Sequence, residues 1–434
     1  GANNVAIGVL ALEMNTTGAG NTALGREALE ANTTASNNTA VGLKAGEAVT
    51  TGTQNTLIGA LAGDATTTGD NNTSVGYVAL TTNTTGDENT AIGRASLFSN
   101  TTGSSNVAIG DHALSENTTA SNNVAVGESA LLANTTGTGN TAVGATSLDA
   151  NTTADGNTAV GSNALSANTT GASNTGIGLG SLQLNTTGAR NTALGNSSLD
   201  NNTEGNDNVG VGLNALDDNT TGDNNTAVGR SSLANNTTAD NNTAFGYFAL
   251  EANTTGHSNV AVGYEALKTN VDGDGLVAIG YKALNVFEPS DGLRYTIAIG
   301  YEAGLACTAG GDNVFIGGLA GHDVTDGNNN VAIGKDALST NVQGDRNTAV
   351  GFEALATMNP SGDVDTNNTG IGQKALTANT TGVNNTGIGS NALDHNTTAS
   401  NNTAVGFKSL TANTTGAENV AVGDEALLAN TTAS

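Results

Sequence analysis

The sequence predicts an all-β fibrous protein: a parallel β-solenoid of 25 coils with 17 residues per coil. Three observations predict this fold. One Gly recurs with a constant period along almost the whole chain, beginning with Gly8, Gly25 and Gly42. The chain contains 60 Gly but only 2 Pro, and only 3% of its residues are aromatic, so a thick conventional core is not expected. Finally, the repeat is too short to hold two helices, because helical repeats need about 33 residues.

The repeat unit, written with its first Asn as position 1, reads N-[TV]-A-[VI]-G-x-x-[AS]-L-x-x-N-T-T-[GA]-x-x. Positions 1–4 alternate apolar or β-branched residues with small ones and end at a Gly, which predicts a short strand followed by a corner. A smaller apolar patch and a triplet rich in turn formers follow. We expect the corner Gly, the Leu and the triplet Asn to be structural residues of every coil, for example Gly25, Leu29, Asn32, Gly127, Leu131 and Asn134.

Stacked coils, separated by about 4.8 Å, would place equal repeat positions in columns. Identical Asn side chains in such a column can hydrogen-bond along the axis, which satisfies their amides without a thick core. The Asn-Thr-Thr triplets also match the N-glycosylation acceptor pattern, at Asn15, Asn32, Asn83 and Asn100 among others. We favour the ladder, because a glycan on every coil would crowd its neighbours.

Residues 1–434 are expected to form a single continuous solenoid. Only two of the 24 intervals between the recurring Gly are longer than the others: Gly280 to Gly300 and Gly351 to Gly372. These insertions lie in 281–300 and 352–372, and each contains one of the two Pro, as expected for a surface loop. Both termini interrupt a repeat, so we expect this chain to be a fragment of a longer fibre.

Charge and composition exclude several partners and activities. The 12 Lys and Arg against 39 Asp and Glu give a net charge of −27, which repels nucleic acid and anionic membranes. No apolar run is long enough to insert into a bilayer. Phosphate-loop, catalytic and metal-ligand spacings are absent, so we predict no enzyme activity and no cofactor. The single Cys307 is expected to be a small buried side chain, with an interchain bond as the alternative.

Aromatic residues are concentrated in one region, since eight of the 13 lie between Phe245 and Tyr301. Four Tyr occupy the position directly after the corner Gly in successive repeats and should form a column. One interpretation is an aromatic ladder that stabilises stacked coils. The other is a sugar- or receptor-binding strip beside the inserted loop at 287–295. The candidate ligand-binding residues are Tyr247, Tyr264, Tyr281, Tyr295 and Tyr301.

Each coil supplies few large apolar side chains, so a single solenoid buries little apolar surface and is expected to be only marginally stable. Side chains alternate along the strand: Thr22 and Leu24 face one way, whereas Ala23 faces the other. One face can line the coil while the other meets a neighbouring chain. We therefore expect a homotrimer of chains side by side, with end-to-end assembly also possible.

Several segments carry a family resemblance: NNVAIGVLAL from Asn3, SNVAIGDHAL from Ser105, NVAVGYEAL from Asn259 and VAIGYKAL from Val277. They resemble the head repeats of YadA-like trimeric autotransporter adhesins, and they are similar to repeats of bacteriophage tail fibres. The resemblance implies a left-handed parallel β-roll of three chains displayed outside the cell for adhesion. This unit is longer than the usual head repeat by a segment that contains Asn-Thr-Thr.

The expected function is a structural and adhesive extracellular fibre, on a cell surface or a virion, that binds a glycan or protein receptor. The alternative is an ice-binding β-solenoid, since Thr columns on a flat face can order water. Adjacent Thr in the triplet point in opposite directions, which disfavours that alternative because a flat array needs Thr-x-Thr.

Overall fold

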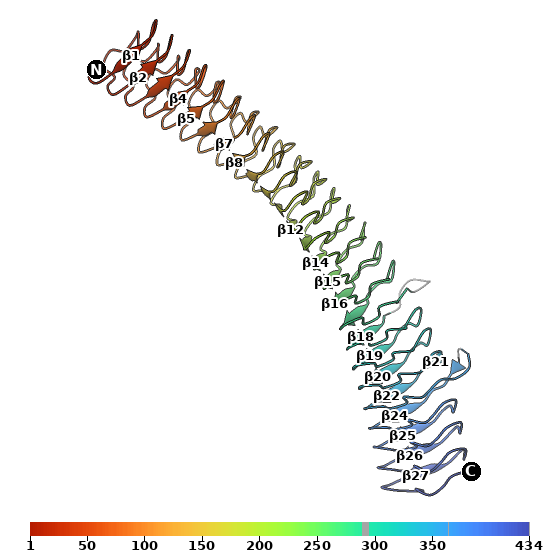
Figure 1. Cartoon of the computed structure of the whole chain (residues 1–434). Helices are drawn as coiled ribbons and strands as arrows, with labels where there is room; N and C mark the ends of the chain where they lie inside the picture. Colours follow the sequence, from red (N-terminus) through yellow and green to blue (C-terminus); the bar gives the residue numbers. More distant parts are fainter. Residues whose placement is uncertain (289–294, 363, 434) are drawn as a thin grey trace. The chain divides into compact units, whose positions relative to one another are not determined.

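The computed structural model describes residues 1–288, 295–362 and 364–433. It confirms an all-β parallel β-solenoid of about 24 turns with about 17 residues per turn. The chain divides into two compact units, Gly1–Thr221 and Gly222–Ser434. In Figure 1 the strands of each unit are arrows that follow one another in chain order.

The described residues of the first unit form thirteen strands. They are β1 Val5–Ile7, β2 Thr22–Leu24, β3 Thr39–Val41, β4 Thr56–Ile58, β5 Thr73–Val75, β6 Thr90–Ile92, β7 Val107–Ile109, β8 Val124–Val126, β9 Thr141–Val143, β10 Thr158–Val160, β11 Thr175–Ile177, β12 Thr192–Leu194 and β13 Val209–Val211.

Fourteen strands lie in the described part of the second unit. They are β14 Thr226–Val228, β15 Thr243–Phe245, β16 Val260–Val262, β17 Val277–Ile279, β18 Ile297–Ile299, β19 Val314–Ile316, β20 Val331–Ile333, β21 Gly344–Asp345, β22 Thr348–Val350, β23 Val364–Asp365, β24 Thr369–Ile371, β25 Thr386–Ile388, β26 Thr403–Val405 and β27 Val420–Val422.

Parallel pairing between successive coils sets the register. Thr158 of β10 pairs with Thr175 of β11, so equal repeat positions lie side by side. The two insertions leave this register intact, since β17 pairs with β18 and β22 pairs with β24 position for position. In the second insertion β23 also pairs with β21. Of the first expected insertion, residues 289–294 lie outside the described residues.

The three strand residues alternate in direction as the sequence predicts. Ala23, the middle residue of β2, is fully buried, whereas Thr22 is half-buried and Leu24 is 44% exposed. The interior is narrow because the inward position is Ala or Gly in most coils. Leu29 and Leu131 at position 9 are fully buried and complete the apolar interior of their coils.

A corner Gly ends each strand at position 5. Gly25 has φ +145° and Gly127 has φ +138°, a region that L side chains rarely adopt. A Cβ atom at either residue would collide with the backbone carbonyl of the same position in the next coil, Gly42 or Gly144. The Gly column therefore exists because the coils stack backbone against backbone at this corner.

Leu at position 9 adopts a left-handed conformation, with φ +52° at both Leu29 and Leu131. This conformation is unfavourable for a bulky L residue by about 1–2 kcal/mol. Full burial of the Leu side chain contributes about 1.5–3 kcal/mol in return. Burial of the Leu side chain thus offsets the cost of the left-handed conformation that bends the coil at position 9.

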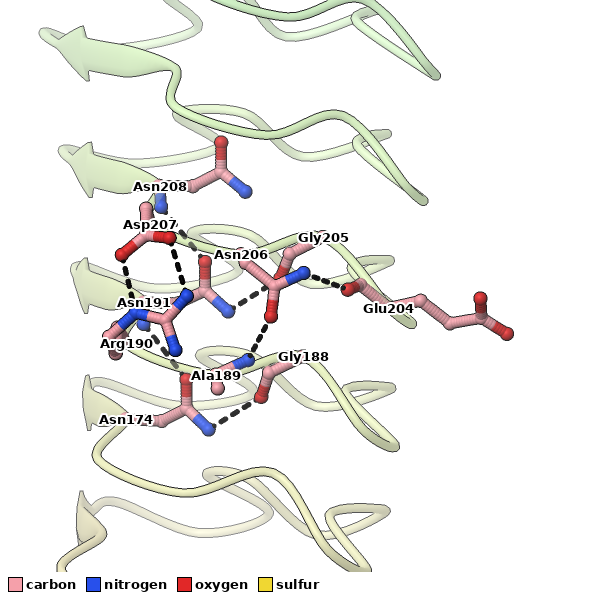
Figure 2. A network of polar contacts seen from close by, with 10 residues as sticks. All are labelled: Asn174, Gly188, Ala189, Arg190, Asn191, Glu204, Gly205, Asn206, Asp207 and Asn208. Atoms are coloured by element: carbon pink, nitrogen blue, oxygen red, sulfur yellow. Dashed lines mark hydrogen bonds and ion pairs between the residues drawn. The ribbon is translucent and has the colours of Figure 1, made fainter.

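Asn at position 1 forms the first buried ladder, which Figure 2 shows around Asn191. The backbone N–H of Asn191 donates to Oδ1 of Asn174 in the preceding coil over 2.9 Å. Its own Nδ2 donates to the carbonyl of Gly205 over 2.7 Å, and its Oδ1 accepts from the N–H of Asn208 over 3.0 Å. Each Asn residue therefore takes part in three hydrogen bonds, two of which join it to the Asn of the preceding and the following coil.

Asn at position 12 forms a second buried ladder. Asn134 Nδ2 donates to Asn117 Oδ1 over 3.2 Å and to the Gly137 carbonyl over 2.9 Å. Its Oδ1 accepts from Asn151 Nδ2 over 2.9 Å. Asn32 follows the same pattern and is fully buried, so a ladder rather than a glycan explains the Asn of the triplet.

The second ladder is interrupted where another residue takes position 12. Val49 follows Asn32 in this column and offers no donor, and Asn32 Oδ1 has no hydrogen-bond partner among the described residues. Cys307 also occupies position 12: its Sγ lies 3.4 Å from the Gly310 carbonyl, the partner that an Asn amide would have. Cys307 is fully buried, and burial raises the pKa of its thiol to about 12.

Two bulky residues replace the usual Ala at position 3, and the interior adjusts around each. Phe315 in β19 is fully buried, and position 9 is Gly instead of Leu in its own coil and in the preceding one, at Gly321 and Gly304. A Cβ at Gly304 would lie 2.8 Å from Phe315 Cδ2. Leu57 likewise packs where position 9 is Gly, at Gly63 in its own coil and at Gly46 in the preceding one. One large side chain thus fills the space of two missing Leu.

Candidate functional site

A stack of four tyrosine rings is the most distinctive surface feature of the second unit. Tyr247, Tyr264, Tyr281 and Tyr301 follow the corner Gly after strands β15 to β18. Successive ring centroids are 5.5, 5.2 and 5.3 Å apart, and the ring planes differ by only 6–10°. The aromatic column that the sequence predicts therefore exists, on the outside of the coils.

Backbone geometry explains the stack. The corner Gly turns the chain, and the in-register pairing of β15 with β16, β16 with β17 and β17 with β18 brings the following residues above one another. Spacings of this size are ordinary for interacting aromatic rings. The ladder interpretation accounts for this spacing, while the exposed ring edges leave a surface open to a ligand.

Charged groups surround the ladder. The Arg230 guanidinium lies 5.8 Å from the centroid of Tyr247, and Lys282 Nζ lies 5.5 Å from that of Tyr281. Two of the four hydroxyl groups meet carboxylates: a hydrogen bond to Glu265 raises the pKa of Tyr264, and one to Glu302 raises the pKa of Tyr301. The strip thus combines aromatic rings with both signs of charge.

Tyr295 does not join this stack. It precedes β18, whereas Tyr301 follows β18, so the two lie at opposite ends of the strand. The Tyr295 ring instead covers Gly275, whose added Cβ would lie 2.8 Å from the ring. Tyr295 is close to the four stacked tyrosines along the chain, but the position within the repeat decides which rings meet.

A second exposed surface runs along the strands. The outward residue at position 4 is apolar in most coils, and in many of them it is 36–44% exposed. The members of this apolar column in the first unit include Leu24, Ile58, Ile92, Ile109, Val143, Ile177 and Leu194. A repeated row of exposed apolar side chains of this kind is typical of an interaction site.

One acidic group in the described part of the chain is close enough to hold a metal ion: Glu27, Glu30 and Glu47, with carboxylate oxygens within 4.8 Å of one another. Lys44 Nζ lies 3.1 Å from Glu27 and 3.0 Å from Glu47. Hydrogen bonds from Arg26 and then Lys44 lower the pKa of Glu27. An ion-pair network across neighbouring coils therefore explains this group.

Three carboxylates lie near one another in the first unit. Burial, then the charges of Asp200 and Asp218, raise the pKa of Asp217 to about 6. Burial also raises the pKa of Asp200, whose Oδ1 has no partner among the described residues. Asn214 donates to Asp217 over 3.1 Å. Asp200 and Asp217 occupy the same repeat position in adjacent coils, which is the sequence signal that indicates this group.

Because the pKa of Asp217 is higher in the folded chain than the usual 3.8, the folded state binds this proton more tightly. The stabilisation is present below about pH 4 and is lost as the pH rises through 6. We expect Asp217→Asn to flatten this decline, measured as the denaturant midpoint between pH 4 and 7.5. Glu116→Gln, which changes an exposed carboxylate, is the control and should show the same decline as the native chain. A decline that is unchanged in Asp217→Asn would contradict the raised pKa of Asp217.

Comparison of the chain with models of known protein families and with curated proteins gives no match. The described residues contain no helix with the length and apolar character needed to cross a bilayer. The structural repeat residues Gly25, Leu29, Asn32, Gly127, Leu131 and Asn134 all serve the corner or the interior, as described above.

Proposed function

We propose that this chain forms the repetitive part of a structural and adhesive extracellular fibre, on a cell surface or a virion. The observation that carries the proposal is the exposed apolar column at position 4. The resemblance of the V-A-I-G segments to YadA-like adhesin heads and to bacteriophage tail fibres supports the same function. We propose no enzymatic role and no cofactor for it.

Self-association follows from this surface. A column of Val, Ile and Leu in most coils can pack against the same column of a second and a third copy, and strands in register keep the spacing equal in each chain. We propose a homotrimer with chains side by side, which can also assemble end to end. The acidic surface disfavours nucleic acid as a partner.

Sedimentation equilibrium tests the assembly. We expect the mass of three chains for the native protein, and dissociation when Ile92→Lys and Ile109→Lys place charges in the apolar column. The control is Thr85→Lys with Thr102→Lys, which adds the same charge at exposed position 14. A native chain that is monomeric at micromolar concentration would contradict the trimer.

The tyrosine ladder is the proposed adhesive contact, with a cell-surface glycan or protein receptor as partner. Removing the two middle rings with Tyr264→Ser and Tyr281→Ser should abolish binding, because the strip loses its continuity. Glycan arrays and binding to intact cells measure this. Tyr77→Ser is the matched control, since Tyr77 occupies position 6 in the first unit and is exposed. Binding that survives in the double variant would contradict this role.

One observation favours the alternative of ice binding. Position 2 carries Thr beside the apolar residue of position 4 on the same outward face, and Thr141, Thr158 and Thr175 align in register. The triplet Thr do not contribute such an array, because Thr33 turns its hydroxyl to the Thr50 carbonyl over 3.1 Å. Thermal hysteresis at micromolar concentration would support this function in place of adhesion.

A further inference from the structure

The tyrosine ladder ends at a glycine. Position 6 is Gly in only one of the 25 repeats, and that residue, Gly318, directly follows Tyr301 in the column. A Cβ built on Gly318 would meet no atom within 4 Å, so the space beside the last ring is open. Tyr301 is accordingly 55% exposed, whereas Tyr264 and Tyr281 inside the stack are each 41% exposed.

The other end of the ladder is closed by the chain itself. Arg230 occupies position 6 in the coil before Tyr247 and lies 5.8 Å from its ring centroid. Phe248 packs against Tyr247 with centroids 4.0 Å apart, and Tyr247 is only half-buried at the surface, less exposed than the rings inside the stack. A guanidinium group thus lies over the first ring of the ladder.

Lys335, the next residue of the column after Gly318, has other partners. Its Nζ lies 3.3 Å from Asp336 and 5.8 Å from the Phe352 ring centroid. The side chain therefore engages its own coil and the coil that follows. Among the described residues, Gly318 leaves a one-coil gap between Tyr301 and Lys335.

We propose that the open face of Tyr301 beside Gly318 binds the guanidinium group of an arginine side chain from a partner protein. This inference deepens the adhesive part of the proposed function and rests on it. A guanidinium plane stacks on an aromatic face while its N–H groups bond a carboxylate. Glu302, whose hydrogen bond raises the pKa of Tyr301, supplies that carboxylate at the edge of the same ring.

The local charges fit this ligand. Glu302 lies beside the ring, His322 Nε2 is 3.9 Å from Glu302, and His322 Nδ1 is 2.6 Å from Asp323. With Asp336, which pairs with Lys335, the carboxylates in this set of charged groups outnumber the ammonium groups. The net charge of −27 further favours a cationic partner segment over an anionic one.

The test uses the full chain labelled with ¹³C in its tyrosine rings, since the protein has only six Tyr. N-acetyl-arginine amide is titrated and the ring signals are followed by nuclear magnetic resonance. We expect a saturable shift confined to Tyr301, and its loss when N-acetyl-lysine amide replaces the arginine probe. A methyl glycoside serves as the third probe, and a Tyr301 shift with the sugar alone would overturn the proposal in favour of carbohydrate.

Two variants sharpen the test. Gly318→Arg supplies a cap within the chain and should abolish the arginine-induced shift, whereas Ala145→Arg makes the same charge change at position 6 of the first unit and should preserve it. Glu302→Gln should weaken the response without disturbing the Tyr264 and Tyr281 signals. A shift that persists in Gly318→Arg, or that affects all tyrosines equally, would overturn the proposal. Sedimentation of the same samples reports the assembly independently, so loss of arginine binding in an intact trimer leaves the fibre proposal standing.

Discussion

Replacing Phe315 with Ala should lower the free energy of unfolding of the second unit by about 3–5 kcal/mol. The Phe315 ring is fully buried, and it fills the interior in two coils at once because Gly304 and Gly321 lack the usual Leu. Ala would leave a cavity that rigid stacked coils cannot collapse to fill. Denaturant unfolding, followed by circular dichroism and limited proteolysis, measures the loss, since repeat arrays can unfold part by part.

A second substitution provides the matched rescue. Gly321 has φ +61°, close to the φ of +51° that Leu338 adopts at the same position in the next coil. Gly321→Leu should therefore clash in the native chain yet restore stability to Phe315→Ala. Phe352→Ala, at an exposed ring, should change stability little. If the double variant is no more stable than Phe315→Ala, then the Phe315 ring does not fill the space that Leu at position 9 fills in other coils.

Gly127→Ala should destabilise the first unit by about 2–6 kcal/mol, the sum of backbone strain and overpacking. Its φ of +138° disfavours any Cβ, and the added atom would lie 2.6 Å from the carbonyl carbon of Gly144 in the next coil. The coils must separate at this corner or the strand must end early. Thermal unfolding of the variant and the native chain measures the effect.

Gly139→Ala is the control for Gly127→Ala. Gly139 has φ +66°, and a Cβ there meets nothing within 4 Å. Gly139→Ala should therefore lower the free energy of unfolding by only about 1–2 kcal/mol, the cost of a left-handed conformation for Ala. Equal losses for the two variants would mean that backbone conformation alone, and not the contact between coils, requires Gly at the corner.

Much of the interior could be predicted from the repeat. The period placed Gly25, Leu29 and Asn32 at fixed phases, and the structure gives each the corner or interior role expected of it. The paired change of Phe315 with Gly304 and Gly321 was also visible in the sequence. The pattern alone does not predict their contact, because the distance between positions 3 and 9 of adjacent coils is not set by the period.

The candidate site was predictable in part for the same reason. Tyr247, Tyr264, Tyr281 and Tyr301 share one phase, so their column followed from the repeat alone. Tyr295 was grouped with them by proximity along the chain, but a strand separates it from Tyr301. The proton affinity of Asp217 depends on burial and on Asp200 in the preceding coil, which composition does not reveal.

By itself, the sequence determined the coil length, the columns and the alternation of inward and outward residues, because these depend only on a period that stacked strands must keep. The tertiary structure alone decided which faces of those columns are closed: that both Asn ladders are buried, that a guanidinium covers one end of the tyrosine stack, and that Gly318 leaves the other end open. Those features depend on side-chain volume and backbone direction in neighbouring coils, and a repeat pattern fixes neither.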